Sequence, residues 1–370
     1  MNQTFQQTHI ITTFNSTSYI NNQPTEIIDN ILYLLLPENT TNTTTEEWWT
    51  SYIQLTTTCK SWNMIATKNP HIWKQLFIRL NSKNPWMCWK LVTGWHKILN
   101  THNRSYKLTL TIEHNTPLSY IGLISNLFSL QNSLQELCIY APIQESELLS
   151  YSLDLVTTSN LKTLIWVTKD NSIPPNNALE FLNSKFTAPI LTTFYLLSNH
   201  LFLLPLRLTS RLTNLHINSP NNKTDEYIEL LANCPTLITL TIGVIEISET
   251  IAENETGIEL SFLTTLTVYP SLTAVSILNH LTTPRLKTFC IKHPPDTRQT
   301  SLHSLEEFIH QNNTTLKSIY VKGYKREEIQ HAIANRFQNA IWKLYWKTKH
   351  YTNYSDIYNI WIEYNPQIYL

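Results

Sequence analysis

The chain has little glycine and little charge. It contains 5 glycines in 370 residues, 15% of its residues are Asp, Glu, Lys or Arg, and its formal net charge is zero. Neither Gly-x-Gly-x-x-Gly nor Gly-Lys-Ser/Thr occurs, which argues against a glycine-rich loop that cradles phosphates. A neutral chain provides no basic field that would hold nucleic acid or an anionic membrane. We therefore expect neither nucleic acid nor a membrane as a partner.

The cysteines are few and widely separated. They are Cys59, Cys88, Cys138, Cys234 and Cys290. No Cys-x-x-Cys pair occurs, so neither a zinc site nor a disulfide framework is indicated, and we expect no metal and no cofactor. No stretch reaches the roughly 18 to 20 apolar residues of a membrane span, and residues 1–22 lack the features of a signal peptide. The expected location is cytoplasmic or nuclear.

Motifs of known catalytic sites are also missing. The sequence contains no nucleophile elbow, no His-Glu-x-x-His and no kinase signature, and its 13 histidines are scattered. The sequence therefore predicts a non-catalytic protein. Catalytic residues can also come together from distant positions, so an enzyme is kept as an alternative.

Two helical patterns occupy residues 23–80. The first follows Pro24, a residue that suits a helix start because the first amides of a helix have no partner within it. Its apolar residues are Ile27, Ile28, Ile31, Leu32, Leu34, Leu35 and Leu36. In the second pattern, Leu55, Cys59, Trp62, Ile65 and Ala66 recur at steps of three and four and so share one helix face. Pro70 ends this helix.

This arrangement resembles the F-box. The matching residues are Pro24, Glu26, Ile27, Ile31, Leu32, Leu55, Cys59, Lys60, Trp62, Ala66, Pro70, Ile72 and Trp73. The chain departs from the family at Gln23, where Leu is usual, and in a polar insertion, residues 38–47, that reads as a surface loop. The resemblance implies that the segment docks on a Skp-type adaptor. The implied adaptor-binding residues are Pro24, Ile27, Ile28, Ile31, Leu32, Leu55, Cys59, Trp62 and Trp73, of which some belong to the small core. An ordinary buried helical hairpin is the alternative.

From residue 106 a different pattern recurs, of the form Leu-x-x-Leu-x-Leu. Its eight copies begin at Leu134, Leu161, Leu191, Leu212, Leu237, Leu263, Leu286 and Leu316, and so lie 21 to 30 residues apart. Each copy predicts a strand with alternate residues inward, and residues 107–112 predict an opening strand. The spacing is close to the period of about 20 to 29 residues in leucine-rich repeats. A competing match at Leu272, Val275 and Ile277 leaves one register open, and a different α/β fold is the alternative.

The chain is thus interpreted as an α/β protein in five parts. These are a disordered lead-in (1–22), an F-box (23–80), a linking helix (81–105), a leucine-rich-repeat solenoid (106–324), and a C-terminal helical cap or tail (325–370). Parallel strands should line the concave face of the solenoid. Residues 226–237 and 302–310 should form helices on its outside. In the C-terminal part, Ile333, Phe337, Ile341, Leu344 and Tyr345 make a helical stripe.

The repeats resemble those that follow F-boxes in many eukaryotic proteins. That resemblance implies the substrate-recognition subunit of a cullin-type ubiquitin ligase, bound to the cullin through the adaptor and holding an unknown target protein. The candidate target-binding residues lie at the non-Leu strand positions and are Tyr140, Tyr195, His216, Tyr269, Lys292, Tyr320 and Lys322. Aromatic and small polar side chains together suit protein recognition. A repeat scaffold without a ligase role is the alternative function.

Overall fold

The structure is a computed structural model in which part of the chain is described. The described residues are 24, 26–28, 30–31, 50–54, 57, 60–68, 75–80, 88–90, 92–94, 105–113, 116, 120, 122, 134–142, 158–168, 187–198, 206–219, 224–243, 257–269, 277–292, 302–312, 314–322 and 341–344. Over these ranges the chain forms a parallel β-solenoid with little helix. The predicted solenoid architecture is therefore confirmed.

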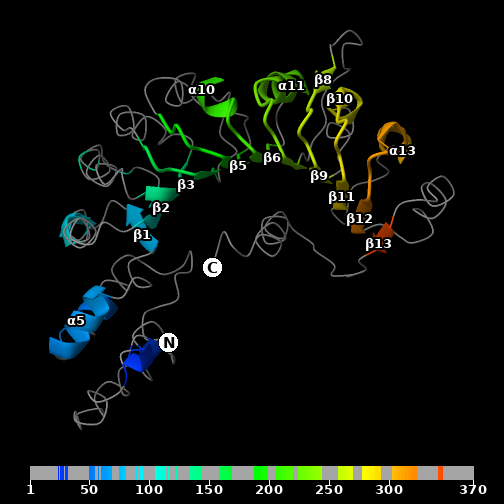
Figure 1. Cartoon of the computed structure of the whole chain (residues 1–370). Coiled ribbons are helices and arrows are strands. Elements are labelled where there is room, and N and C mark those ends of the chain that lie inside the picture. The colour runs from blue at the N-terminus through cyan, green and yellow to red at the C-terminus, as the bar shows by residue number, and fades with distance from the viewer. Residues whose placement is uncertain are drawn as a thin grey trace.

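The solenoid is built on one eleven-stranded sheet whose strands follow chain order. The strands are β1 (Gln75–Leu80), β2 (Tyr106–Ile112), β3 (Leu134–Tyr140), β4 (Thr163–Val167), β5 (Thr193–Leu197), β6 (Asn214–Asn218), β7 (Thr239–Gly243), β9 (Thr265–Tyr269), β11 (Thr288–Lys292), β12 (Ser318–Lys322) and β13 (Ile341–Leu344). All neighbouring pairs are parallel. Figure 1 shows the sheet curving along the inner side of an arc.

The middle residue of the repeat pattern aligns across the sheet into one buried column. Its members are Leu76, Leu108, Leu137, Leu164, Phe194, Leu215, Leu240, Leu266, Phe289 and Ile319, each paired in register with the next. None is more than 1% exposed. Burying one such side chain is worth roughly 1.5–3 kcal/mol, but a single repeat cannot cover its own apolar face. The stacking of repeats supplies the cover, so this column is the main reason for the fold.

A tight turn leads into six of the strands. In each turn the amide of the first repeat leucine donates to the carbonyl three residues earlier, as from Leu161 to Thr158 (3.3 Å) and from Leu191 to Ala188 (3.1 Å). The same bond is made by Leu212, Leu237, Leu263 and Leu286. The residue that accepts this bond is buried in every case. The turns therefore stack into a second column beside the strands, which fixes the register between repeats.

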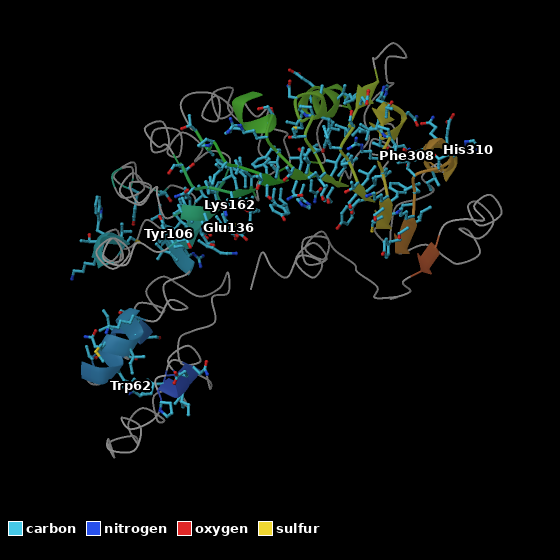
Figure 2. The ribbon with its side chains drawn as sticks, viewed as in Figure 1. Trp62, Tyr106, Glu136, Lys162, Phe308 and His310 are labelled. Carbon is cyan, nitrogen blue, oxygen red and sulfur yellow. The ribbon has the colours of Figure 1, made fainter. Side chains whose placement is uncertain are left out.

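Short helices and a small second sheet lie on the outer side of the arc (Figure 1). They are α10 (Leu206–Thr209), α11 (Thr224–Ala232), α13 (Leu302–Gln311) and the parallel pair β8 (Ile258–Glu259) and β10 (Leu281–Thr282). Phe308 of α13 packs on Phe289 of β11, with ring centroids 5.3 Å apart, while His310 is exposed (Figure 2). The helix predicted at residues 302–310 is confirmed by α13, whereas α11 covers the one predicted at residues 226–237 only as far as Ala232, and residues 233–237 lead through a turn to β7.

The N-terminal part contains the helix α5 (Lys60–Lys68) and helical residues 26–28, 30–31, 50–54 and 57. These stretches do not establish a helical F-box, which stays a prediction. The strand β1 falls within the range assigned to the F-box but pairs with β2 as the first strand of the solenoid sheet. Residues 88–90 and 92–94, within the predicted linking helix, are helical.

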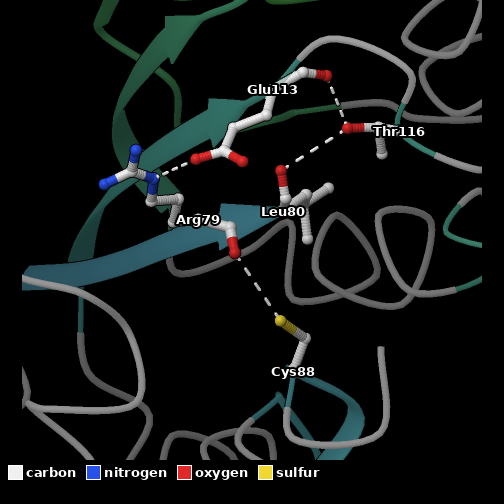
Figure 3. A network of polar contacts seen from close by, with 5 residues as sticks. All are labelled: Arg79, Leu80, Cys88, Glu113 and Thr116. Atoms are coloured by element: carbon white, nitrogen blue, oxygen red, sulfur yellow. Dashed lines mark hydrogen bonds and ion pairs between the residues drawn. The ribbon is translucent and has the colours of Figure 1, made fainter. Parts of the chain in front are cut away.

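Polar contacts join this N-terminal part to the sheet (Figure 3). Arg79 of β1 donates through Nε to Glu113 Oε1, just after β2. The Thr116 hydroxyl donates to the Glu113 carbonyl at 2.7 Å and approaches the Leu80 carbonyl at 3.4 Å. The Cys88 thiol lies 3.7 Å from the Arg79 carbonyl. The residues after β2 and around Cys88 are thus packed against the first strand of the sheet.

At the C-terminal end the prediction needs a correction. Residues 341–344 form β13, which continues the ladder from β12, although Ile341 and Leu344 were assigned to a helical stripe. The helix is therefore wrong for these four residues, since the open edge of β12 offers backbone partners that a strand can satisfy. The other residues of that stripe lie outside the described part of the chain.

Candidate protein-binding face

The strand residues that point away from the core form the face we call the concave face. They fall into three rows, aligned by the register of the strands. The first row is Glu136, Thr163, Thr193, Asn214, Thr239, Thr265, Thr288 and Ser318, and the second is Cys138, Ile165, Tyr195, His216, Thr241, Thr267, Cys290 and Tyr320. The third is Tyr140, Val167, Leu197, Asn218, Gly243 and Tyr269, followed at the same strand position by the paired Lys292 and Lys322.

The first row is polar throughout, and every member is half-buried. At its N-terminal end Glu136 forms an ion pair with Lys107 of β2, with Oε2 and Nζ 2.7 Å apart. Further along, the Asn214 amide donates to the Thr193 hydroxyl at 3.1 Å. A row of hydroxyl and amide groups offers hydrogen bonds to a partner without imposing a net charge. It suits the rim of a protein interface.

The second and third rows carry an apolar cluster on β3, β4 and β5 that also includes Tyr269 of β9. It consists of Cys138, Tyr140, Ile165, Val167, Leu197 and Tyr269, with Tyr195 packed against it. Ile165 and Val167 of β4 were not among the predicted residues. The sequence could have predicted them, because side chains alternate along a strand. If Leu164 and Trp166 point inward, Ile165 and Val167 must lie on the opposite face. The cluster gives the concave face an apolar part and a polar part.

Two aromatic rings meet where these parts join. Tyr195 of β5 and His216 of β6 are cross-strand neighbours, and their rings stack with centroids 4.2 Å apart and planes 7° from parallel. Tyr195 is half-buried and His216 is buried. Burial raises the pKa of the Tyr195 phenol, with the charge of Glu136 acting in the same direction. The phenol therefore stays neutral and able to donate a hydrogen bond.

A thiol in the second row is strongly shielded from water. Burial raises the pKa of the Cys138 thiol to about 12, while a hydrogen bond with Tyr140 lowers it and the Glu136 charge raises it. A thiol with this pKa is protonated at neutral pH. Since the thiolate is the reactive form, Cys138 has the character of a buried apolar residue, not of a nucleophile.

The structure places five of the seven predicted target-binding residues on the concave face, and of Lys292 and Lys322 it describes only the backbone pairing of their strands. Tyr195, His216 and Tyr320 lie in the second row, and Tyr140, Tyr269, Lys292 and Lys322 occupy the third strand position. Tyr195 and His216 are in contact, whereas Tyr140 and Tyr269 share the apolar cluster. Tyr140, His216 and Tyr269 are buried, and Tyr195 and Tyr320 are half-buried. That these residues bind a target stays a prediction.

Of the predicted adaptor-binding residues that the structure describes, some are buried and others are exposed to solvent. Ile28 and Trp62 are buried, whereas Ile27 is 44% exposed, Pro24 is exposed and Ile31 is half-buried. Trp62 lies on α5, as Figure 2 shows. Ile28 and Trp62 thus belong to the core, while Ile27 offers apolar surface. Leu32, Leu55, Cys59 and Trp73 lie outside the described residues.

No group of three or more His, Cys, Asp or Glu side chains in the described part of the chain is arranged to hold a metal ion. No helix within the described ranges has both the length and the apolar character needed to span a bilayer.

Comparison with known proteins identifies no family. No model of a protein family matches the chain, and the search of curated proteins found no match. The F-box and leucine-rich-repeat resemblances therefore rest on the sequence motifs described above.

Proposed function

We propose that the chain is a protein-binding receptor, the substrate-recognition subunit of a cullin-type ubiquitin ligase. The observation that carries the binding role is the concave face, whose three rows run in register over the parallel strands β3 to β12. Half-buried hydroxyls and amides lie beside the stacked Tyr195 and His216. Rigid aromatic area next to adaptable hydrogen-bonding groups is typical of protein-recognition surfaces.

The leucine-rich-repeat assignment belongs to the same proposal. It is supported by the eight Leu-x-x-Leu-x-Leu copies, whose middle residues occupy equivalent buried positions in successive strands. The outer helices are few and short, and the pair β8 and β10 takes the place of a helix in part of the outer side.

The ligase role rests on the F-box resemblance. The Cys-Lys-Ser-Trp motif leads into α5, where Trp62, Ile65 and Ala66 are buried while Met64 is 54% exposed. At the first helical pattern the amides of Ile27 and Ile28 donate to the Pro24 carbonyl, at 3.0 and 3.2 Å, as a helix beginning at this proline requires. These features support helices that pack one side into the protein and leave exposed apolar side chains on the other side, which an adaptor could cover.

In this role the chain performs no chemistry of its own. The solenoid holds a target protein and the N-terminal part binds the Skp-type adaptor, so the target's lysines are brought near the conjugating enzyme at high effective concentration. Only residues 69–74 separate α5 from β1, the first strand of the sheet. So short a connection restricts how far the two binding parts can move apart.

Adaptor binding is the decisive test. Purified chain is incubated with an immobilised Skp-type adaptor, beside an Ile27→Asp variant that places a charge on exposed apolar surface. The matched control is Ile190→Asp, which makes the same change at another exposed isoleucine, in the turn before β5. The proposal expects wild type and Ile190→Asp to be retained and Ile27→Asp to be lost. Circular dichroism establishes that all three are folded.

A scaffold without a ligase role is the second candidate. The favouring observation is that β1, inside the range assigned to the F-box, is the first strand of the solenoid sheet. The segment before it could then serve as the N-terminal cap that a solenoid requires. A folded wild-type chain that does not bind the adaptor would leave this candidate standing and reject the ligase role.

A further inference from the structure

The edge of the sheet at which the strands begin carries its own surface, separate from the concave face. Residues just before the strands form a backbone ladder across this edge. The Thr264 amide donates to the Ile238 carbonyl at 2.9 Å, the Lys287 amide to Thr264 at 2.9 Å, and the Lys317 amide to Lys287 at 2.8 Å. Ile238, Lys287 and Lys317 are all exposed. The ladder therefore runs over four repeats in the order Ile238, Thr264, Lys287 and Lys317, and it sets the two lysines on neighbouring repeats.

The preceding turns add two more exposed side chains to this edge. Phe262 lies in the turn before Thr264 and Arg285 in the turn before Lys287. The Arg285 guanidinium carbon lies 5.4 Å from the centroid of the Phe262 ring, a distance typical of a cation–π contact. Phe262 is 50% exposed and Ile238 is 44% exposed. We call Ile238, Phe262, Arg285, Lys287 and Lys317 the edge patch.

The cations of the edge patch form no ion pair with a described acidic side chain. The ion pairs among the described residues are Arg79 with Glu113 and Lys107 with Glu136, and neither includes a patch residue. The acidic side chain nearest in sequence is Glu259, which accepts a hydrogen bond from the Ser261 hydroxyl at 2.7 Å. A chain of zero net charge thus carries three cations beside two exposed large apolar side chains. Such a combination marks an interaction surface.

We propose that the edge patch binds an acidic polypeptide segment that carries apolar side chains. Carboxylates of the segment would pair with Arg285, Lys287 and Lys317, and its apolar side chains would cover Ile238 and Phe262. Charge complementarity of this kind steers association and fixes the register of a partner. A polypeptide fits better than a nucleic acid, because nucleic-acid affinity depends on many phosphate contacts and two of the five patch residues are uncharged. This inference is independent of the ligase role.

The test uses the full chain and a fluorescein-labelled peptide in which pairs of glutamates alternate with single leucines, followed by fluorescence anisotropy. The control peptide has glutamine in place of every glutamate. We expect the acidic peptide to bind and the control not to bind. A Lys287→Glu, Lys317→Glu variant should bind the acidic peptide roughly tenfold or more weakly. Phe262→Ser should weaken binding as well, because it removes the apolar part of the patch.

Matched variants separate the edge patch from charge elsewhere on the same edge. Lys162→Glu reverses an exposed cation before β4, several repeats away, and should leave binding within about twofold of wild type. Thermal melts establish that each variant is folded. Equal binding of both peptides, or undiminished binding by the double variant, would overturn the proposal. So would displacement of the acidic peptide by a thymidine oligonucleotide that binds more tightly, which would identify a nucleic-acid site.

Discussion

The His216 imidazole lies parallel to the Tyr195 phenol, with ring centroids 4.2 Å apart, at equivalent positions of adjacent strands. Stacked aromatic pairs contribute about 0.5–1.5 kcal/mol beyond the area that they bury. The pair therefore ties β5 to β6 through side chains as well as through the backbone ladder. It also fixes the orientation of a half-buried tyrosine on the concave face.

A double-mutant cycle of Tyr195→Ala and His216→Ala should measure this contact. We expect the two destabilisations to be non-additive by about 1 kcal/mol, because either change alone already removes the stack. Urea denaturation gives the free energies of unfolding. As a control, His216→Ala with Tyr320→Ala, on strands separated by three others, should be additive. An additive result for Tyr195 with His216 would mean that the stack contributes nothing.

Alkaline pH should destabilise the chain through its buried thiols. Burial raises the pKa values of Cys138 and Cys234 from 9.0 to about 12 in the folded state. Above pH 9 the unfolded thiols lose their protons while the folded ones keep them, so the folded state binds more protons and stability falls as pH rises towards 12. The slope approaches about 1.4 kcal/mol per pH unit for each thiol.

The measurement is the unfolding free energy as a function of pH for wild type and for Cys138→Ala, Cys234→Ala. The double variant should lose less stability than wild type between about pH 9 and about pH 11. Thr241→Ala, which changes a buried residue of the concave face that does not titrate, should keep the wild-type slope. If the unfolding free energy of wild type and of the double variant fell equally steeply with pH, the alkaline loss of stability would not come from these thiols.

Two adjacent turns are joined by a buried hydrogen bond. The Thr283 hydroxyl lies 2.8 Å from Asn312 Oδ1, and the same amide donates through Nδ2 to the Phe308 carbonyl at 2.9 Å near the end of α13. Asn312→Ala should destabilise the chain by about 1–3 kcal/mol, since it leaves buried polar groups unsatisfied. Thr283→Val, which removes only the hydroxyl of this pair, should cost less. A larger loss for Thr283→Val, measured by urea denaturation, would refute this order.

Neighbouring residues in one turn should differ sharply in their contribution to stability. Leu191 is 1% exposed, whereas Ile190 is 39% exposed. Leu191→Ala should lower the free energy of unfolding by about 2–5 kcal/mol through the cavity it leaves. Ile190→Ala should change it by less than about 0.5 kcal/mol, as is usual for surface positions. Similar losses in the two variants, measured by urea denaturation, would show that the turn is not packed as described.

The strands were the most predictable part of the fold. The inward residues of a parallel strand are completely buried, so Leu137, Leu215 and Leu240 are restricted to large apolar types and leave a pattern that the sequence preserves. The turn before each strand left a weaker signal. Thr158, Ala188 and Leu260 occupy the same buried position but differ in both size and polarity.

There are physical reasons why some elements could not be predicted from the sequence. The strand β1 alternates Leu76, Ile78 and Leu80 as a strand should, but it directly follows the F-box-like helices and was included in the range assigned to the F-box. The strands β8 and β10 are each two residues long, and so short a segment carries no periodicity. The edge patch depends on a contact between Arg285 and Phe262 that joins two repeats, and only the register of the fold brings them together.

The strict chain order of the sheet has a mechanical consequence. Among the described residues each inner strand is bonded only to the strands before and after it, and no pairing there closes the sheet on itself. A force applied to the two ends would therefore load the terminal strands first and peel them away one by one. We expect such a molecule to yield to force in a series of small steps instead of rupturing at once.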